Sequence, residues 1–303
     1  MKTLLAYLRL TRPANLPTAV ADVALGFAVS GSIYLGTSEI FPEVMASRLV
    51  KFPWLVLSTI GLYGGGVVLN DVFDYELDKV ERPERPLPQG DASLSGAILL
   101  GVLLLIAGIF SAAQVNTYAF YISLIISALV ISYDYWAKHH IFWGPFNMGA
   151  CRGFNLLLGI SIYPPILFSY YPLALIPIVY IAAITLVSQG EVRGGNRPAL
   201  YLALGLYVSV IIGIGLSIQS LGKLFWHSFP FLVLFSFLTI RPLLAAIKDP
   251  VAKNVFKAVK FGVLSLVVMD AALAAGFAGW FYGILVLTLL LLSLVLAKLF
   301  AVT

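Results

Sequence analysis

The sequence predicts an all-α protein that crosses a membrane many times. Of its 303 residues, 60% are hydrophobic and only 11% are charged, whereas soluble domains are about 45–50% apolar and about 25% charged. A soluble globule could not cover such an excess of apolar surface, so most of the chain is expected to face lipid. Stretches without charge follow one another along the chain, which predicts a single membrane-embedded domain over residues 1–303.

Ten stretches are long enough to cross a bilayer, since a spanning helix needs about 20 apolar residues. The last two are separated only by a short turn, so we expect them to form a hairpin. The first ten residues are interrupted by Arg9 and lack a cleavage site, which favours an amphipathic surface helix over a signal peptide. The predicted spans are 13–34, 52–72, 93–113, 117–136, 144–162, 170–188, 199–219, 225–246, 256–276 and 279–300.

The basic residues predict the orientation of these spans. Fifteen of the 19 Lys and Arg residues fall on the side of the N-terminus, three fall on the opposite side, and Arg152 lies inside a span. Basic loops stay in the cytoplasm, so both termini and the polar loop 73–92 are expected there, in an inner or plasma membrane of bacterial type. The same bias explains the net charge of +5, and no nucleic-acid partner is expected. The single cysteine, Cys151, excludes an internal disulfide.

An acidic segment follows the second span. On a continuous helix Asp71, Asp74 and Asp78 would fall within about 60° of one another. Three carboxylates on one face repel each other unless a hard cation neutralises them, and Mg²⁺ takes carboxylate and phosphate oxygens. The alternative is a solvated loop. The position at the end of a span, and the forked donors of Arg82 and Arg85, favour a site for a magnesium-bound diphosphate.

The same residues resemble the first signature of the UbiA superfamily of intramembrane prenyltransferases. Two further elements agree with it: Arg12-Pro13 before the first span, and Tyr133 followed five positions later by Lys138. The resemblance covers residues 9 to about 250. The signature reads Asn70-Asp71-x-x-Asp74-x-x-x-Asp78, then Arg85-Pro86-Leu87-Pro88-x-Gly90.

The resemblance implies nine transmembrane helices around a central cavity, with the tenth span as a C-terminal addition. It also implies Mg²⁺-dependent transfer of a prenyl group from an isoprenoid diphosphate to an aromatic or similar small acceptor. Basic groups would balance the charge that develops on the leaving diphosphate. The expected catalytic residues are Asp71, Asp74, Asp78, Glu191 and Lys138, the first four also as metal ligands. The expected substrate-binding residues are Asn15, Asn70, Arg82, Arg85, Tyr133, Arg152, Asn155 and Arg193.

The second acidic motif of the family is incomplete. Glu191 matches its first acid, but Gly195 stands where the second belongs. A Glu-Val-x-Gly-Gly-Asn loop resembles the EboC-like members of ebo-type gene clusters, which are associated with export of a small metabolite precursor. A second hypothesis is therefore a non-catalytic carrier or component of such an export system. The complete first motif favours the enzyme.

Polar residues inside the spans need a reason, because a charge at the bilayer centre costs roughly 2.5–3.5 kcal/mol. Asn15 and Asp22 lie on one face of the first span with Arg12, and Arg152 and Asn155 repeat the Arg-x-x-Asn pattern in the fifth. Two interpretations stay open. The residues either line the active cavity, or they form interhelical hydrogen bonds that fix packing.

Overall fold

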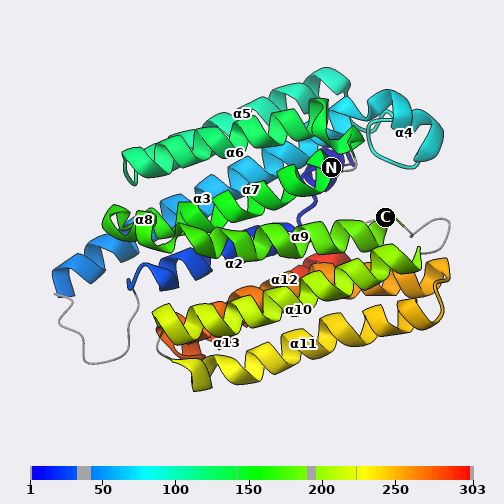
Figure 1. Cartoon of the computed structure of the whole chain (residues 1–303). Coiled ribbons are helices and arrows are strands. Elements are labelled where there is room, and N and C mark those ends of the chain that lie inside the picture. Colours follow the sequence, from blue (N-terminus) through cyan, green and yellow to red (C-terminus); the bar gives the residue numbers. More distant parts are fainter. Residues whose placement is uncertain (1, 33–41, 141, 190–195, 223, 301–303) are drawn as a thin grey trace.

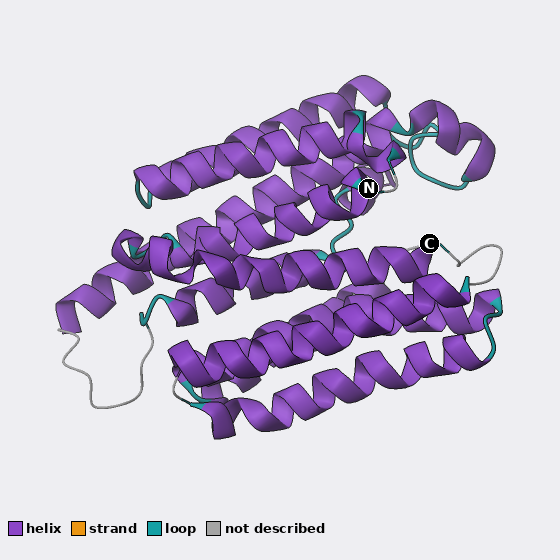
Figure 2. Ribbon diagram, viewed as in Figure 1, coloured by secondary structure: helices purple, strands orange, loops and turns teal. Residues whose placement is uncertain are grey.

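The computed structural model describes residues 2–32, 42–140, 142–189, 196–222 and 224–300, and these residues form helices and connecting turns (Figure 2). The long helices lie side by side in one bundle (Figure 1). The predicted all-α class is confirmed over the described ranges. The helices are α1 Lys2–Leu10, α2 Leu16–Val29, α3 Pro42–Phe73, α4 Tyr75–Glu81, α5 Leu94–Ala113, α6 Thr117–Tyr135, α7 Trp143–Ile160, α8 Leu167–Tyr170, α9 Leu175–Ser188, α10 Arg197–Ser217, α11 Phe225–Lys248, α12 Ala252–Ala278 and α13 Trp280–Phe300.

Each predicted span coincides with a helix. Within the described residues, eight helical segments are long and apolar enough to cross a membrane. The first predicted span is shorter than expected, because α2 runs only from Leu16 to Val29. The fifth, α7, is more polar, since Asn147, Arg152 and Asn155 interrupt its apolar residues. The predicted hairpin is confirmed at Gly279, whose φ of 91° lets the chain reverse between α12 and α13.

Small residues let the helices approach closely. A Cβ on Gly65 of α3 would lie 2.9 Å from the carbonyl oxygen of Gly101 on α5. Gly26 of α2 and Gly159 of α7 likewise face each other's backbone. Such contacts replace the hydrophobic driving force that helices lack inside lipid. Gly65 therefore allows α3 and α5 to pack closely.

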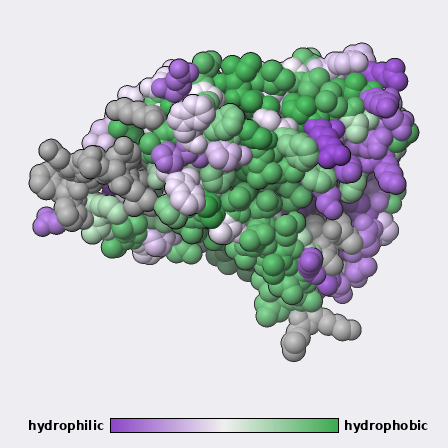
Figure 3. Space-filling model, turned by 90° about the horizontal axis from the view of Figure 1, so that it is seen from below, coloured by the Kyte–Doolittle hydropathy of each residue, from purple (hydrophilic) through white to green (hydrophobic). Residues whose placement is uncertain are grey.

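The two ends of the bundle differ in character. One end of the bundle carries the N-terminus, α4, the last turn of α13, the C-terminal end of α9 and the N-terminal end of α10 (Figure 1). Seen from below, the middle of the molecule is mostly hydrophobic and hydrophilic residues gather toward that same end (Figure 3). The termini and the acidic loop therefore share one side, as predicted. That this side is cytoplasmic stays a prediction.

Candidate functional site

The acidic loop begins where α3 ends. α3 stops at Phe73, Asp74 occupies the junction with φ −86° and ψ 1°, and α4 starts at Tyr75. The expected continuous helix across Asp71, Asp74 and Asp78 is therefore not what the structure shows. Backbone hydrogen bonds still preserve helical spacing, because the amide of Asp78 donates to the carbonyl of Asp74 at 2.7 Å. The interruption changes which partners the three carboxylates meet.

Two of the carboxylates share one guanidinium. Arg85 Nη1 donates to Asp78 Oδ2 at 2.5 Å and to Asp71 Oδ1 at 3.2 Å. Arg12 Nη2 donates to the same Asp71 oxygen at 2.6 Å. Asp71 and Asp78 are buried, and charge-assisted hydrogen bonds of this kind are about twice as strong as neutral ones. Asp71 is thus held by two basic residues from different parts of the chain.

The third carboxylate has a separate partner. Lys138 lies in a 3₁₀ turn, Ala137–His139, directly after α6. Its Nζ donates to Asp74 Oδ1 at 2.5 Å. Tyr133 lies five positions earlier, on α6. The structure therefore brings Lys138 onto the acidic loop, and a role for Tyr133 stays a prediction.

Arg12 is held in a strained backbone conformation. Its φ of 45° makes it the only described residue besides glycines with a positive φ, which costs about 1–3 kcal/mol for such a residue. The amide of Asn15 donates to the carbonyl of Arg12 at 2.9 Å and helps to hold this turn. Because α2 begins only at Leu16, Arg12 does not continue the polar face of Asp22, contrary to expectation. Its guanidinium reaches Asp71 instead.

Asp134 is a site residue that the sequence reasoning missed. It lies in the last turn of α6 and is 3% exposed. Asn70 Nδ2 donates to Asp134 Oδ1 at 2.8 Å, which ties the amide of the acidic loop to α6. Its signal in the sequence was an acid inside an apolar span, four positions before Lys138. We call the cluster of charged and amide side chains at this end of the bundle the mouth site. Its residues are Arg12, Asn70, Asp71, Asp74, Asp78, Arg85, Asp134 and Lys138.

Arg152 and Asn155 belong to a second polar cluster, the interior network. Arg152 Nε lies 3.0 Å from Asp22 Oδ2, and its Nη2 donates to the carbonyl of Thr18 at 2.9 Å. Asn155 Nδ2 donates to Asp22 Oδ2 at 3.0 Å, and its Oδ1 accepts from Thr59 at 2.8 Å. All five residues are buried. These contacts support the packing interpretation, because they engage Arg152 and Asn155 with α2 and α3.

Four more predicted residues lie apart from these contacts or outside the description. Arg82 is exposed at the end of α4. Asn15 is half-buried at the start of α2, where its carbonyl accepts from the Thr18 hydroxyl at 2.8 Å. Glu191 and Arg193 lie outside the described residues. The last turn of α9 and the first turn of α10, which flank this segment in the sequence, lie at the end of the bundle that carries α4 (Figure 1).

The oxygen donors of the mouth site suit magnesium, although not as an all-protein cage. Among the described residues, no three Asp, Glu, His or Cys side chains lie close enough together to hold a metal ion. Asp71 and Asp78 nevertheless converge on one cationic group, Arg85. Mg²⁺ is commonly bound by one or two carboxylates and completes its octahedral shell with water and phosphate oxygens. The site therefore fits a magnesium ion that binds together with a diphosphate.

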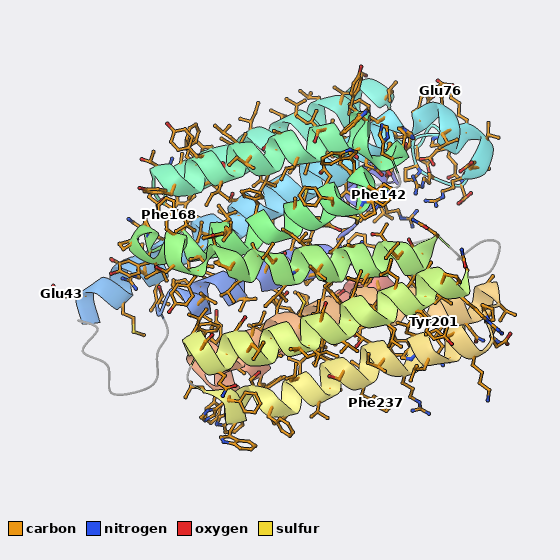
Figure 4. All side chains as sticks on the ribbon, in the orientation of Figure 1. Glu43, Glu76, Phe142, Phe168, Tyr201 and Phe237 are labelled. Carbon is orange, nitrogen blue, oxygen red and sulfur yellow. The ribbon has the colours of Figure 1, made fainter. Side chains whose placement is uncertain are left out.

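Other charged groups at this end do not join the site. Glu76 is exposed on α4 at the outer edge of the molecule (Figure 4), where its carboxylate accepts from Lys79 Nζ at 2.8 Å. An exposed pair of this kind contributes little to stability. The pair therefore offers a control for substitutions in the mouth site.

Comparisons with known proteins agree with this arrangement. The model of the UbiA prenyltransferase family matches residues 24–257. A digeranylgeranylglyceryl phosphate synthase of Saccharolobus solfataricus is 30% identical over 157 residues, which are 52% of this chain and 51% of that protein. One from Thermococcus onnurineus is 37% identical over 114 residues, 38% of this chain and 37% of that protein. The chain thus matches about half the length of these relatives, or less.

Solved structures show the same fold. A structure of digeranylgeranylglyceryl phosphate synthase in membranes has a TM-score of 0.68 at 23% identity, covering 92% of this chain and 99% of that one. A UbiA homologue from Archaeoglobus fulgidus, bound to DMAPP and Mg²⁺, has a TM-score of 0.63 at 16% identity, covering 93% and 99%. These comparisons do not support the finer EboC-like assignment. The family match covers most of the chain, and the fold agrees with it, so the chain belongs to the UbiA prenyltransferase family.

Proposed function

We propose that this protein transfers a prenyl group from an isoprenoid diphosphate to a small acceptor, with Mg²⁺ as cofactor, at the mouth site. The observation that carries the proposal is the convergence of carboxylates and basic side chains at one end of an apolar bundle. Acidic groups from α3 and α4 meet Arg12 from before α2, Arg85 from the loop after α4, and Lys138 from beyond α6. A ligand that consists of an anion with a bound cation would engage the basic and the acidic side chains at the same time, and few other ligands would.

The observed ion pairs suggest how the diphosphate is held. Arg12, Arg85 and Lys138 each neutralise a carboxylate in the structure. Magnesium bound with the diphosphate would supply positive charge to Asp71, Asp74 and Asp78 in their place. The two arginines can then turn their forked donors to phosphate oxygens, and Lys138 can offer a compact cation. The exchange leaves no buried carboxylate without a positive partner, which would be costly.

The reaction follows from this placement. The bond between C1 of the prenyl group and the diphosphate oxygen breaks, and the diphosphate leaves with the electron pair. Arg12, Arg85 and Lys138 stabilise the charge that develops on it. The acceptor then forms a bond to C1 and loses a proton to the surroundings. The apolar bundle excludes water from the allylic cation. A central cavity for the prenyl chain remains part of the proposal.

The acceptor class rests on two indications. The sequence resemblance suggested an aromatic or similar small molecule, whereas the names of the curated relatives indicate a glyceryl phosphate. We take both as acceptors to be tested. Glu191 and Arg193 are proposed to complete the site from the loop between α9 and α10.

One observation favours the carrier hypothesis as a second candidate. Gly195 stands in place of the second acid of the family. A protein that binds and releases a diphosphate-bearing molecule, without cleaving it, would need less metal. An EboC-like role in export would be a function of this kind.

A direct assay separates the two functions. The purified protein is incubated with Mg²⁺ and labelled dimethylallyl, geranyl or geranylgeranyl diphosphate, with hydroxylated aromatic acids or geranylgeranylglyceryl phosphate as acceptors. We expect a prenylated product and released diphosphate, both lost when the metal is chelated. Magnesium-dependent binding without turnover on any of these acceptors would favour the carrier.

The orientation is tested separately. We propose that the mouth site faces the cytoplasm, because it lies at the end of the bundle that carries most basic residues. A cysteine at the exposed position 84, in a Cys151→Ala background, should resist a membrane-impermeant thiol reagent in intact cells and react after lysis. Strong labelling of Glu84→Cys from outside would overturn this orientation.

A further inference from the structure

Asp134 has an unmet hydrogen-bonding need that the other mouth carboxylates lack. Its Oδ1 accepts from Asn70, but its buried Oδ2 has no hydrogen-bond partner among the described residues. A buried polar atom left unsatisfied costs about 1–3 kcal/mol, and more when it is charged. Asp71, Asp74 and Asp78 each have a basic partner. The Oδ2 atom of Asp134 therefore has room for a hydrogen bond from a further donor.

The position of Asp134 indicates where that donor comes from. Asp134 lies in the last turn of α6, four residues before Lys138, which follows that helix in a 3₁₀ turn. Asn70 lies in the last turn of α3, four residues before Asp74, whose amide still donates to the carbonyl of Asn70 at 3.0 Å. The Asp134–Asn70 pair therefore lies deeper in the bundle than the Lys138–Asp74 pair. Among the described residues, Lys138, Asp74 and Arg12 lie within electrostatic range of Asp134. A diphosphate bound at Lys138 with its chain in the apolar interior would place C1 on the inner side, toward Asp134.

We propose that Asp134 binds the reacting hydroxyl of the acceptor, so that the natural acceptor is an alcohol or phenol. This inference rests on the proposed prenyl transfer. A hydroxyl group donates its hydrogen to the free Oδ2 and presents its oxygen lone pair to C1. Asn70 holds the carboxylate in one orientation, which keeps the hydroxyl in line. A phosphate would be repelled by Asp134, and a carbon nucleophile without a hydroxyl would leave Oδ2 unpaired.

A cycle of protein and ligand changes tests the contact. The probes are geranylgeranylglyceryl phosphate and 4-hydroxybenzoate, each beside its analogue with hydrogen in place of the hydroxyl. Binding is measured by calorimetry with wild type and Asp134→Asn, which retains the side-chain volume and an oxygen for Asn70. For at least one pair, removal of the hydroxyl should weaken binding to wild type by roughly 10- to 100-fold, the size of a hydrogen bond to a charged group. In Asp134→Asn the two ligands of that pair should bind within about threefold of each other, since the interaction is already lost.

Controls keep the result specific. Ser132→Ala changes a half-buried residue of the same helix, whose hydroxyl accepts from Asn147 at 2.8 Å. This variant should show the same difference in affinity between the hydroxylated ligand and its analogue as wild type does. Ser132→Ala should also bind magnesium with geranylgeranyl diphosphate within about threefold of wild type. If Asp134→Asn does not fold, Asp134→Glu provides the test, because its displaced carboxylate should reduce the discrimination at least threefold.

The outcomes separate this inference from the proposed function. Full discrimination in Asp134→Asn or Asp134→Glu would overturn the hydroxyl contact. So would a folded Asp134→Asn that no longer binds magnesium with the prenyl diphosphate, because Asp134 would then serve the diphosphate through Asn70. If wild type binds the prenyl diphosphate but binds both members of each ligand pair equally well, the hydroxyl contact is refuted and the proposed prenyl transfer is not. Wild type that binds no prenyl diphosphate refutes the proposed function.

Discussion

The mouth site and the interior network use the same residue types for different purposes. Both combine Asp, Arg and Asn side chains from separate helices. In the interior network each side chain is buried and has a partner on another helix, since Arg152 donates to a backbone carbonyl of α2 and Asn155 accepts from Thr59. In the mouth site the bases come from segments between or beyond helices, and the Arg12 side chain is 28% exposed.

This contrast shows that the same side chains can serve packing or binding. A charge sealed by its neighbours inside a bundle has no capacity for a ligand. A charge whose partner sits at a helix end can exchange that partner, because solvent stabilises the released group. The four predictions below test whether this division holds, in decreasing order of expected effect.

The largest effect is expected from breaking the interior network. Arg152→Met removes the cation beside Asp22 and leaves a buried carboxylate without its ion pair, next to Asp270 on α12. Loss of one partner of a buried pair costs about 3–5 kcal/mol. Thermal unfolding in detergent should show this destabilisation, and Asp22→Asn in the same chain should recover most of it. A stable Arg152→Met with weakened ligand binding would place Arg152 in the active cavity instead.

Substitutions in the mouth site should act on binding rather than on folding. Asp71→Asn and Asp74→Asn each remove one carboxylate, and we expect magnesium-dependent binding of a prenyl diphosphate to fall by roughly 10- to 100-fold. The unfolding temperature should fall less than in Arg152→Met, because Arg12 is 28% exposed and Asp74 is 19% exposed, whereas Arg152 and Asp22 are 9% and 1% exposed. Glu76→Gln, in the exposed pair on α4, is the matched control. If both Asp variants bind normally, the acidic loop is only solvated surface.

Arg12 allows strain and binding to be separated. Arg12→Gly should leave the unfolding free energy within about 1 kcal/mol of wild type, because relief of the positive φ offsets the lost ion pair. Affinity for the prenyl diphosphate should nevertheless fall by about tenfold, since a hydrogen bond to a charged group is worth about 1.5–3 kcal/mol. Chemical denaturation and ligand titration measure the two effects. A large loss of stability with unchanged affinity would show that Arg12 is only structural.

The smallest effect is expected at the incomplete second motif. Gly195→Asp restores the acid four positions after Glu191, and a further oxygen ligand should lower the magnesium concentration for half-maximal ligand binding by about tenfold or less. Impaired binding would show that the loop has been reshaped for another ligand, or that position 195 requires glycine. Identical magnesium titrations would show that this loop does not face the metal.

Much of the fold could be predicted because it depends on local composition. Ten apolar stretches predicted helices in the right places, and the distribution of the basic residues predicted that the acidic segment and both termini share one end. The Gly65 contact with α5 also followed from a local signal. Length and hydrophobicity decide whether a segment spans a bilayer, and neither depends on the partner helix.

The chemistry of the mouth site was also partly determined by the sequence. Spacing and residue type identified Asp71, Asp74, Asp78 and Arg85 as one group, and the family resemblance added Lys138. Their contacts join them in two ion-pair clusters at one end of the bundle. Their roles toward a ligand stay predictions. The helix break at Asp74 was not predictable, since no proline or glycine marks it.

Only the tertiary structure decided which charges meet. Asp134 joined the mouth site because the rotation of α6 against α3 turns it to Asn70. Arg12 left the polar face of α2 because a strained turn directs it to Asp71. Arg152 found Asp22 because the closely packed α2 and α7 seal both from lipid. Hydrophobicity along the chain determines which segments enter the membrane, but the pairing of charges depends on helix rotation, packing distance and turn strain, which arise only when distant segments come together.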